Sequence, residues 1–229
     1  MSIRNTAVPI ERVEVSAYRI PTDLPEADGT YAWDSTTLVV VEATAGGMRG
    51  LGHTYADTAT ALLIRDTLAA SVRGRNAFDL SGAWDAMVHS IRNLGRPGIA
   101  SMAISGVDVA LWDLKAKLLD LPLCKLLGQA REAVPVYGSG GFTSYSITQL
   151  QQQLGGWVTQ GIPRVKMKIG THPADDLDRV RAARAAIGPE ADLYVDANGA
   201  YTRKQALRQA ELFADLGVVW FEEPVSSDD

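Results

Sequence analysis

The second half of the chain alternates strand and helix patterns, and this alternation restricts the possible folds more than any other feature. Apolar stretches of strand length alternate with longer amphipathic stretches, and Gly, Pro or Asn residues separate them. The expected order is strand 134–140, helix 146–160, strand 164–170, helix 175–187, strand 192–199, helix 202–216 and strand 218–224. Strands that alternate with helices in this way form a parallel sheet.

Each of these strands carries a polar residue near its end, and the polar residues recur at a nearly constant interval. They are Ser139, Lys168, Asp196 and Glu222, at successive steps of 29, 28 and 26 residues. A (β/α)8 barrel of about 250 residues consists of eight units of roughly 31 residues each. The repeat therefore predicts a TIM-type barrel, of which only about the first four strands are present.

An open, doubly wound sheet is the competing architecture. It would place a glycine-rich phosphate loop after its first strand, where this chain has GSGG at 138–141. This stretch lacks the G-x-G-x-x-G spacing, and no acidic residue ends a strand about twenty positions later. The barrel is the fold that we expect.

The first part of the chain has its strands first and its helices after them. Strands are expected at 11–20, 35–44 and 47–53, and helices near 58–73, 79–93 and 99–120. This order is typical of an α+β domain. We therefore divide the chain into an α+β domain at 1–128 and a barrel half at 129–229.

Composition excludes several classes of function. The 22 basic residues are scattered along a chain of net charge −5, so no positive stripe is available for nucleic acid. No stretch approaches the roughly 18 apolar residues of a membrane-spanning helix, and the N-terminus lacks the apolar core of a signal peptide. We expect a cytoplasmic protein that binds neither nucleic acid nor membranes. The single cysteine, Cys124, is expected to be buried.

Charged side chains gather near the ends of the expected barrel strands. Residues i and i+2 of a strand point to the same side, so Lys166 projects beside Lys168, and Asp196 beside Asn198. Two ammonium groups in a barrel interior need a role beyond packing. A neighbouring cation disfavours the charged form of a lysine, so one lysine of the pair can act as a base.

Asp196 and Glu222 offer the hard oxygen ligands that Mg²⁺ prefers. Each has a simpler explanation when taken alone, an Asx-turn for Asp196 and a solvated strand end for Glu222. Their combination with the lysine pair favours a metal site. Two carboxylates do not complete an octahedron, so further ligands must be supplied.

Together these motifs resemble one enzyme family. K-x-K at 166–168, D-x-N at 196–198 and E-E-P at 222–224 are similar to the strand-end motifs of the mandelate racemase and muconate-lactonizing branch of the enolase superfamily. The stretch AISGVDVALWDLKAKLLDLPLCKLLG (103–128) resembles the helix that joins that branch's capping domain to its barrel. The resemblance covers the whole chain and implies an α+β capping domain followed by a (β/α)8 barrel.

The resemblance also implies roles for single residues. Lys168 would be the base for one face of the substrate's α-carbon, and Lys166 its electrostatic partner. Asp196 and Glu222 would bind Mg²⁺.

Further candidates concern substrate contact. Asn198, Ser139 and His53 would touch the substrate. Two capping-domain loops, at 21–33 and 53–57, would close over it as a lid.

The shared reaction of the family is removal of the proton α to a carboxylate, with Mg²⁺ stabilising the resulting enolate. The resemblance implies a small carboxylate substrate and, as first choice, dehydration of a sugar acid. Racemisation of a 2-hydroxy acid and cycloisomerisation are the alternatives. From other classes, a Schiff-base aldolase would use Lys166 or Lys168 as nucleophile, and a non-catalytic binding fragment would give the lysines no role.

Length is the departure from the family. Members carry a third metal ligand on the fifth barrel strand, whereas this chain ends at Asp229 after the fourth expected strand. We expect the full-length protein to be a homo-oligomeric enzyme. The segment alone is expected to be inactive and to self-associate through open sheet edges.

Overall fold

A computed structural model describes residues 7–229, so the first six residues of the expected capping domain lie outside the described part. The chain forms two compact units. One contains the chain through Pro21 together with Ser35–Glu132, and the other contains Thr22–Asp34 together with Ala133–Asp229. The segment 22–34, which we expected in the first domain, thus belongs to the second unit.

The first unit is built on a three-stranded sheet. Its strands are β1 (Arg12–Ala27), β2 (Ala32–Ala45) and β3 (Met48–Tyr55), in the order β1-β2-β3. β2 and β3 are antiparallel and are joined by a tight turn at Gly46 and Gly47. Both glycines have φ in the left-handed region, 55° and 77°, which other residues rarely adopt.

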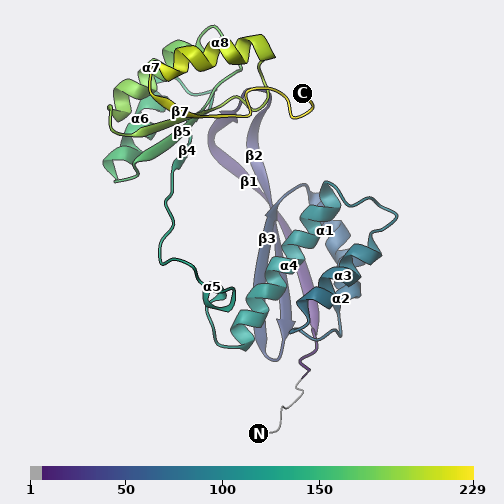
Figure 1. Ribbon diagram of the computed structural model, residues 1–229. Coiled ribbons are helices and arrows are strands. Elements are labelled where there is room, and N and C mark those ends of the chain that lie inside the picture. Colours follow the sequence, from purple (N-terminus) through teal and green to yellow (C-terminus); the bar gives the residue numbers. More distant parts are fainter. Residues whose placement is uncertain (1–6) are drawn as a thin grey trace. The chain divides into compact units, whose positions relative to one another are not determined.

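Helices cover this sheet (Figure 1). They are α1 (Thr58–Leu63), a π-helical turn (Ile64–Leu68), α2 (Ala69–Val72), α3 (Leu80–Ser90) and α4 (Ile99–Leu118). A short helix, α5 (Leu123–Leu126), follows α4 and contributes no residue to this core. The π-helical turn interrupts the helix expected at 58–73. The expectation for Cys124 is wrong, because the thiol is exposed on α5, a short helix with no buried residue.

Helix α4 packs closely along β3. A Cβ added to Gly50 or Gly52 of β3 would collide with backbone atoms of α4, so only glycine permits this approach. The apolar side of α4, including Val107 and Leu111, is buried in the core of the unit. No helix of the described residues is long and apolar enough to cross a membrane.

The second unit contains a four-stranded parallel sheet. Its strands are β4 (Gly138–Gly140), β5 (Arg164–Lys168), β6 (Asp192–Asp196) and β7 (Val218–Glu222), in the order β4-β5-β6-β7. They alternate with α6 (Ile147–Thr159), α7 (Asp176–Ile187) and α8 (Arg203–Ala214). The expected order of strands and helices is therefore confirmed, with shorter strands than predicted.

The three helices lie on one face of this sheet (Figure 1). Val165, Met167, Leu193 and Val195 alternate along β5 and β6 and are fully buried against the helices, together with Phe213 of α8. The residues between them point to the opposite face, which we call the site face. Period-two alternation thus separates an apolar core from a face free to carry charge.

Local sequence sets where the helices begin. α6 starts with a capping box of Ser146 and Gln149, and α8 with one of Thr202 and Gln205. In each pair the hydroxyl oxygen accepts a hydrogen bond from the backbone N–H of the glutamine. The side-chain oxygen of that glutamine accepts one from the backbone N–H of the serine or threonine.

The segment expected to be a lid loop at 21–33 is mostly strand. β1 extends to Ala27 and β2 begins at Ala32, so only 28–31 forms the turn. Trp33 Nε1 donates to Glu26 Oε2 across the hairpin at 2.7 Å, and the Asp28 carboxylate accepts from two backbone N–H groups of the turn. These contacts explain why a polar, glycine-containing segment is ordered as a hairpin end.

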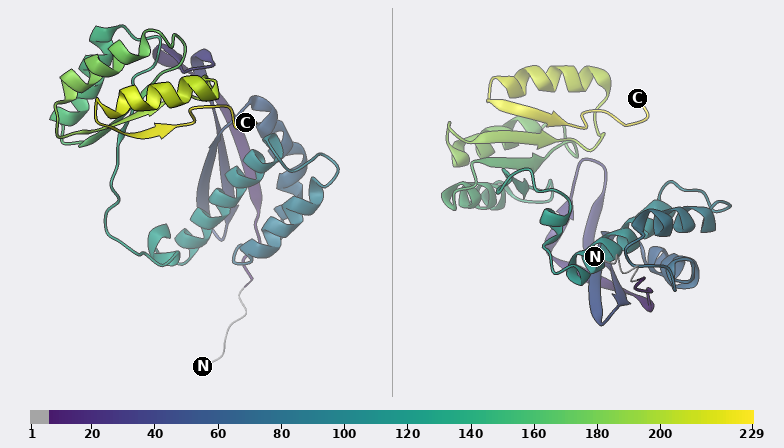
Figure 2. Two further views of the ribbon diagram at one scale, coloured as in Figure 1. Left: turned by 45° about the horizontal axis from the view of Figure 1, so that its top comes forward. Right: turned by 60° about the horizontal axis from the view of Figure 1, so that its bottom comes forward.

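This hairpin end contacts the loops that follow β4, β5 and β6 (Figure 2). Thr143 N donates to Ala27 O at 2.8 Å, and Thr171 Oγ1 donates to Asp28 O at 2.6 Å. Gly29 lies against the backbone oxygens of the residues that follow β5 and β6. The expected loop is thus a docked hairpin end, and its role as a lid stays a prediction.

Candidate active site

Charged side chains of β5, β6 and β7 form one connected cluster on the site face. Lys166 Nζ donates to Asp196 Oδ2 at 3.1 Å and to Glu222 Oε2 at 2.7 Å. Lys168 Nζ donates to Asp196 Oδ2 at 2.6 Å and to Asn198 Oδ1 at 2.9 Å. The parallel register explains the cluster, because it aligns Lys168 with Asp196, and Asp196 with Glu222, across adjacent strands.

The central charges of the cluster are withdrawn from water. Lys166 is 6% exposed and Asp196 is 1% exposed. Burial alone would lower the pKa of Lys166, but its hydrogen bonds to Glu222 and Asp196 outweigh this effect and raise that pKa. Burial likewise opposes ionisation of Asp196, yet the bond from Lys168 leads the interactions that lower the pKa of this carboxyl group. Lys166 and Asp196 are therefore held as an ion pair.

Asp196 uses its two carboxylate oxygens differently. Oδ1 accepts from the backbone N–H of Asn198 at 3.0 Å, which is the Asx-turn considered from the sequence. Oδ2 accepts from both lysines. The turn places Asn198 in the left-handed region, with φ of 48°, and its side-chain oxygen reaches Lys168. The Asx-turn is therefore present, and a role of Asp196 in metal binding stays a prediction.

The carboxylates of Asp196 and Glu222 fit a divalent cation as a partial ligand set. Both place an oxygen within 3.1 Å of a single cationic atom, Lys166 Nζ, so their charges converge on one position. Within residues 7–229, no group of three or more His, Cys, Asp or Glu side chains is arranged to hold a metal. Octahedral Mg²⁺ would need additional oxygen ligands from other groups.

The remaining predicted site residues differ in position. Ser139 pairs with Lys166 across β4 and β5 and is exposed, so it belongs to the same sheet as the cluster. His53 lies on β3 in the first unit, where it pairs with Val40 of β2. Its contact with a substrate stays a prediction.

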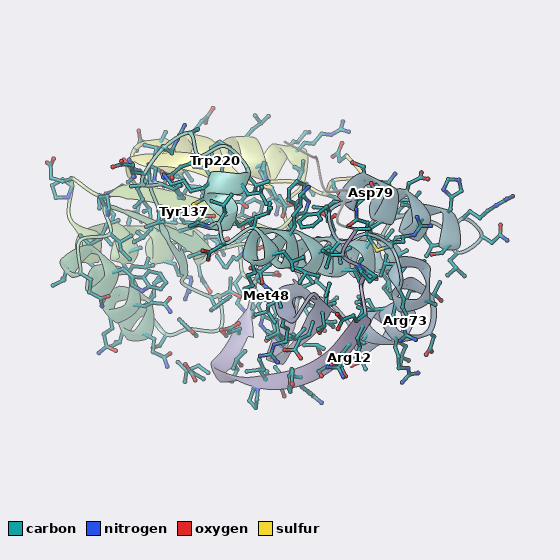
Figure 3. All side chains as sticks on the ribbon, turned by 90° about the horizontal axis from the view of Figure 1, so that it is seen from below. Arg12, Met48, Arg73, Asp79, Tyr137 and Trp220 are labelled. Atoms are coloured by element: carbon teal, nitrogen blue, oxygen red, sulfur yellow. The ribbon has the colours of Figure 1, made fainter. Side chains whose placement is uncertain are left out.

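Aromatic residues that we did not predict continue the site face toward the amino ends of the strands. Tyr137 places its ring 5.6 Å from Lys166 Nζ and packs edge-on against Tyr194. Tyr137, Tyr194 and Trp220 line a pocket of about 730 Å³ that also includes Glu222. Figure 3 labels Tyr137 and Trp220 of this group. The signal was present in the sequence, because Tyr137, Tyr194 and Trp220 each precede a candidate residue by two positions.

Two family models match the chain and together cover most of it. Residues 12–128 match the mandelate racemase / muconate lactonizing enzyme N-terminal domain, and residues 149–229 match the enolase C-terminal domain-like family. The chain belongs to the mandelate racemase and muconate lactonizing enzyme family. The fold is accordingly that of the enolase superfamily, with an N-terminal capping domain and part of a C-terminal barrel domain.

Similar proteins of this family include enzymes that act on acid sugars. A mandelate racemase/muconate lactonizing enzyme-like protein from Rubrobacter xylanophilus is 57% identical, with a TM-score of 0.95 over 96% of this chain and 62% of its own. The 3,6-anhydro-alpha-L-galactonate cycloisomerase of Streptomyces coelicolor is 35% identical over 96% of this chain and 63% of its own length.

A third relative was solved with magnesium. The L-talarate/galactarate dehydratase of Salmonella typhimurium, liganded with Mg and L-lyxarohydroxamate, is 29% identical with a TM-score of 0.92. The match covers 100% of this chain and 62% of the dehydratase. The chain therefore spans about 60% of the length of its relatives. The magnesium bound in solved relatives is consistent with a requirement for Mg²⁺ in this family.

Proposed function

We propose that this chain forms part of an enzyme that removes the proton α to a carboxylate with the help of Mg²⁺, and that the reaction is dehydration of a sugar acid. The observation that carries the proposal is the cluster in which Lys166 and Lys168 share Asp196 Oδ2. The site face would be the interior of a (β/α)8 barrel, with residues 1–128 as capping domain and 129–229 as the first barrel half. The parallel order β4-β5-β6-β7 supports this assignment.

Each residue of the cluster has a separate task in the proposed mechanism. Lys168, as the free amine, accepts the proton from the α-carbon and becomes an ammonium ion. Lys166 stays charged and stabilises the negative charge that develops on the substrate carboxylate. Asp196 and Glu222 would hold Mg²⁺, which supplies further stabilisation of this charge when bound. Asn198 and Ser139 are proposed substrate contacts.

Dehydration and cycloisomerisation begin with the same proton transfer and differ in the bond that breaks next. In a dehydratase the hydroxyl on the β-carbon takes up a proton and leaves as water, and in a cycloisomerase a ring oxygen leaves the carbon and takes up the proton instead. The 35% identity to a cycloisomerase favours the second reaction as the alternative candidate. The 32% identity to a sugar-acid dehydratase over 96% of this chain supports the first.

Replacement of Lys168 by Ala tests the assignment of the base. In the whole protein, with Mg²⁺ and a panel of sugar acids, Lys168→Ala should lower the exchange of the α-proton with deuterated water by at least about a hundredfold. Binding of Mg²⁺, measured by calorimetry, should change little. Lys204→Ala on α8 is a matched lysine outside the cluster and should exchange at the parent rate. Unchanged exchange in Lys168→Ala would contradict the role of this lysine.

A further inference from the structure

One buried carboxylate outside the charged cluster joins two of the loops that follow the strands. Asp176, in the first turn of α7, is 1% exposed. Its Oδ2 accepts a hydrogen bond from the backbone N–H of Gly170 at 3.0 Å and another from the hydroxyl of Tyr201. The two donors lie in the loops after β5 and β6, so one oxygen atom connects both.

These two loops carry residues of the proposed site. Gly170 follows Lys168 by two positions, and Tyr201 follows Asn198 by three. The sheet ladder ends with the bond from Ile169 N to Asp196 O at 3.0 Å. Gly170 then turns away with φ of 104°, and its buried N–H needs an acceptor outside the ladder. Asp176 provides that acceptor.

The next turn of α7 reaches the third loop. Arg179 Nη1 donates to Tyr145 O at 2.8 Å, and its Nη2 donates to Phe142 O at 2.9 Å. Both carbonyls belong to the loop after β4, the strand that carries Ser139. The start of α7 thus contacts the loops after β4, β5 and β6.

Burying a carboxylate to join two loops is unfavourable, because the charged group loses its hydration. Burial raises the pKa of Asp176, although the bonds from Tyr201 and Gly170 partly compensate. Apolar packing would join the same loops without desolvating a charge. What packing does not provide is direction, because hydrogen bonds fix the positions of the two donors relative to each other.

We propose that Asp176 is a positioning residue that holds the strand ends carrying Lys168 and Asn198 in the relative geometry that proton transfer needs. The proposal rests on the function proposed above. Lys168 contacts Asn198 at 2.9 Å, and an error of about 1 Å in such a pair costs a large part of the rate. Tyr201 completes the anchor from the side of Asn198.

Amide hydrogen exchange, resolved to single residues by mass spectrometry, tests the proposal on this chain without turnover. Asp176→Ala should speed exchange at Gly170 about tenfold or more, because its N–H loses a charged acceptor. Exchange at the amide of Asn198, which Asp176 does not touch, should rise as well. Asp176→Asn keeps an acceptor oxygen and should restore both amides to near the parent rate.

Two further variants separate positioning from general destabilisation. Ile187→Val creates a small cavity at the other end of α7. It should leave the ratio of the amide exchange rates of Asn198 and Val195 at its parent value. Tyr201→Phe removes only one of the two hydrogen bonds and serves if Asp176→Ala does not fold. It should raise exchange at Asn198 relative to Val195.

The outcomes decide in both directions. Faster exchange at Gly170 and Asn198, reversed in Asp176→Asn, supports the proposal. Faster exchange at Gly170 alone, or at neither amide, overturns it and leaves Asp176 a local structural role. In the whole protein, Tyr201→Phe should lower kcat about tenfold with KM within about twofold. If the parent turns over no sugar acid, the proposed function fails, while the exchange ratios still decide the role of Asp176.

Discussion

The buried charges of the lysine cluster are compensated by opposite charges. Lys166 and Asp196 are almost inaccessible, and Nζ of the lysine lies 3.1 Å from Oδ2 of the aspartate. Removing one member of such a pair leaves the other buried without compensation, which typically costs about 3–5 kcal/mol. Asp108, in contrast, is a partly buried carboxylate without such a match.

Asp108 opposes folding at neutral pH. It lies on α4 in a small pocket beside Trp84 and Trp112, where burial raises its pKa above the ordinary 3.8. Within residues 7–229 no cation or donor offsets this effect. A raised pKa means that the folded state binds the proton more tightly than the unfolded state does. Stability therefore falls as the pH rises from the unfolded pKa of 3.8 to above the raised pKa of the folded state. Asp108→Asn should therefore raise the free energy of unfolding at neutral pH by roughly 0.5–1 kcal/mol.

Urea unfolding at neutral and acid pH checks this prediction. The gain should disappear below pH 3.8, where the carboxyl group is neutral in both states. Asp85→Asn on α3, whose side chain is 71% exposed, is the control and should change stability little. A loss of stability in Asp108→Asn at neutral pH would show that the carboxylate has a favourable partner.

At the scale of elements, α7 holds the second unit together at both of its ends. Its last turn carries Arg184, which donates to four backbone carbonyls in the loops that precede β6 and β7. The bonds run to Leu216 O (2.8 Å), Gly188 O (2.9 Å), Ala191 O (2.6 Å) and Gly217 O (2.9 Å). The other end of the helix carries Asp176, on the side of the site.

Arg184→Ala should destabilise the second unit by roughly 2–4 kcal/mol, because four carbonyls lose a common donor. Urea unfolding followed by circular dichroism measures the loss. Arg181→Ala on the same helix removes only an exposed pair with Asp178 and should stay within about 0.5 kcal/mol of the parent. Equal effects of the two substitutions would contradict the role of Arg184.

Docking of the hairpin end 22–34 depends on a glycine. A Cβ on Gly29 would lie 2.8 Å from Ile169 O and 2.9 Å from the Cβ of Ala200, and closer still to the carbonyl of Ala197. Gly29→Ala should therefore weaken docking by about 1–3 kcal/mol, since the hairpin end must move away.

Limited proteolysis and the fluorescence of Trp33, which packs edge-on against Phe142, report on this docking. Gly29→Ala should speed cleavage within 22–34 and shift the emission to longer wavelength. Gly156→Ala in α6 meets open space and should leave both readouts unchanged. If Gly29→Ala behaves like the parent, the hairpin end tolerates displacement without loss of contact.

At the scale of the molecule, apolar surface on the second unit should drive association. β4 and β7 are the outer strands of the four-stranded sheet. On β7, Val219 is 61% exposed and Trp220 57%, and Val136, two residues before β4, is 60% exposed. Outer strands with apolar side chains pair readily with other chains. We predict that this 229-residue chain self-associates at micromolar concentration.

Val219→Lys should reduce this association at least about tenfold, because it introduces a charge on the outer strand. Ala210→Lys, at an exposed position on α8, adds the same charge without removing a large apolar side chain and should have little effect. Sedimentation velocity over a range of concentrations measures both. A parent chain that stays monomeric throughout would contradict the prediction.

Sequence patterns that involve only nearby residues were sufficient to predict much of the fold and of the candidate site. Strand alternation predicted which side of β5 carries Lys166 and Lys168, because successive side chains of a strand must point to opposite faces. Capping boxes set locally where α6 and α8 begin, since each box lies within four consecutive residues. The repeat of strand-end residues aligned Asp196 with Glu222, because parallel strands of similar length bring their carboxyl ends to one edge.

Only the tertiary structure decided features that depend on residues far apart in the chain. Asp176 appears in the sequence as an ordinary acidic residue of a first helical turn, and its partners Gly170 and Tyr201 become known only when the loops are in place. The family resemblance implied a lid loop at 21–33, whereas most of this segment forms the docked hairpin end. Its order comes from contacts with Thr143 and Thr171, more than 100 residues away, and no local pattern encodes such contacts.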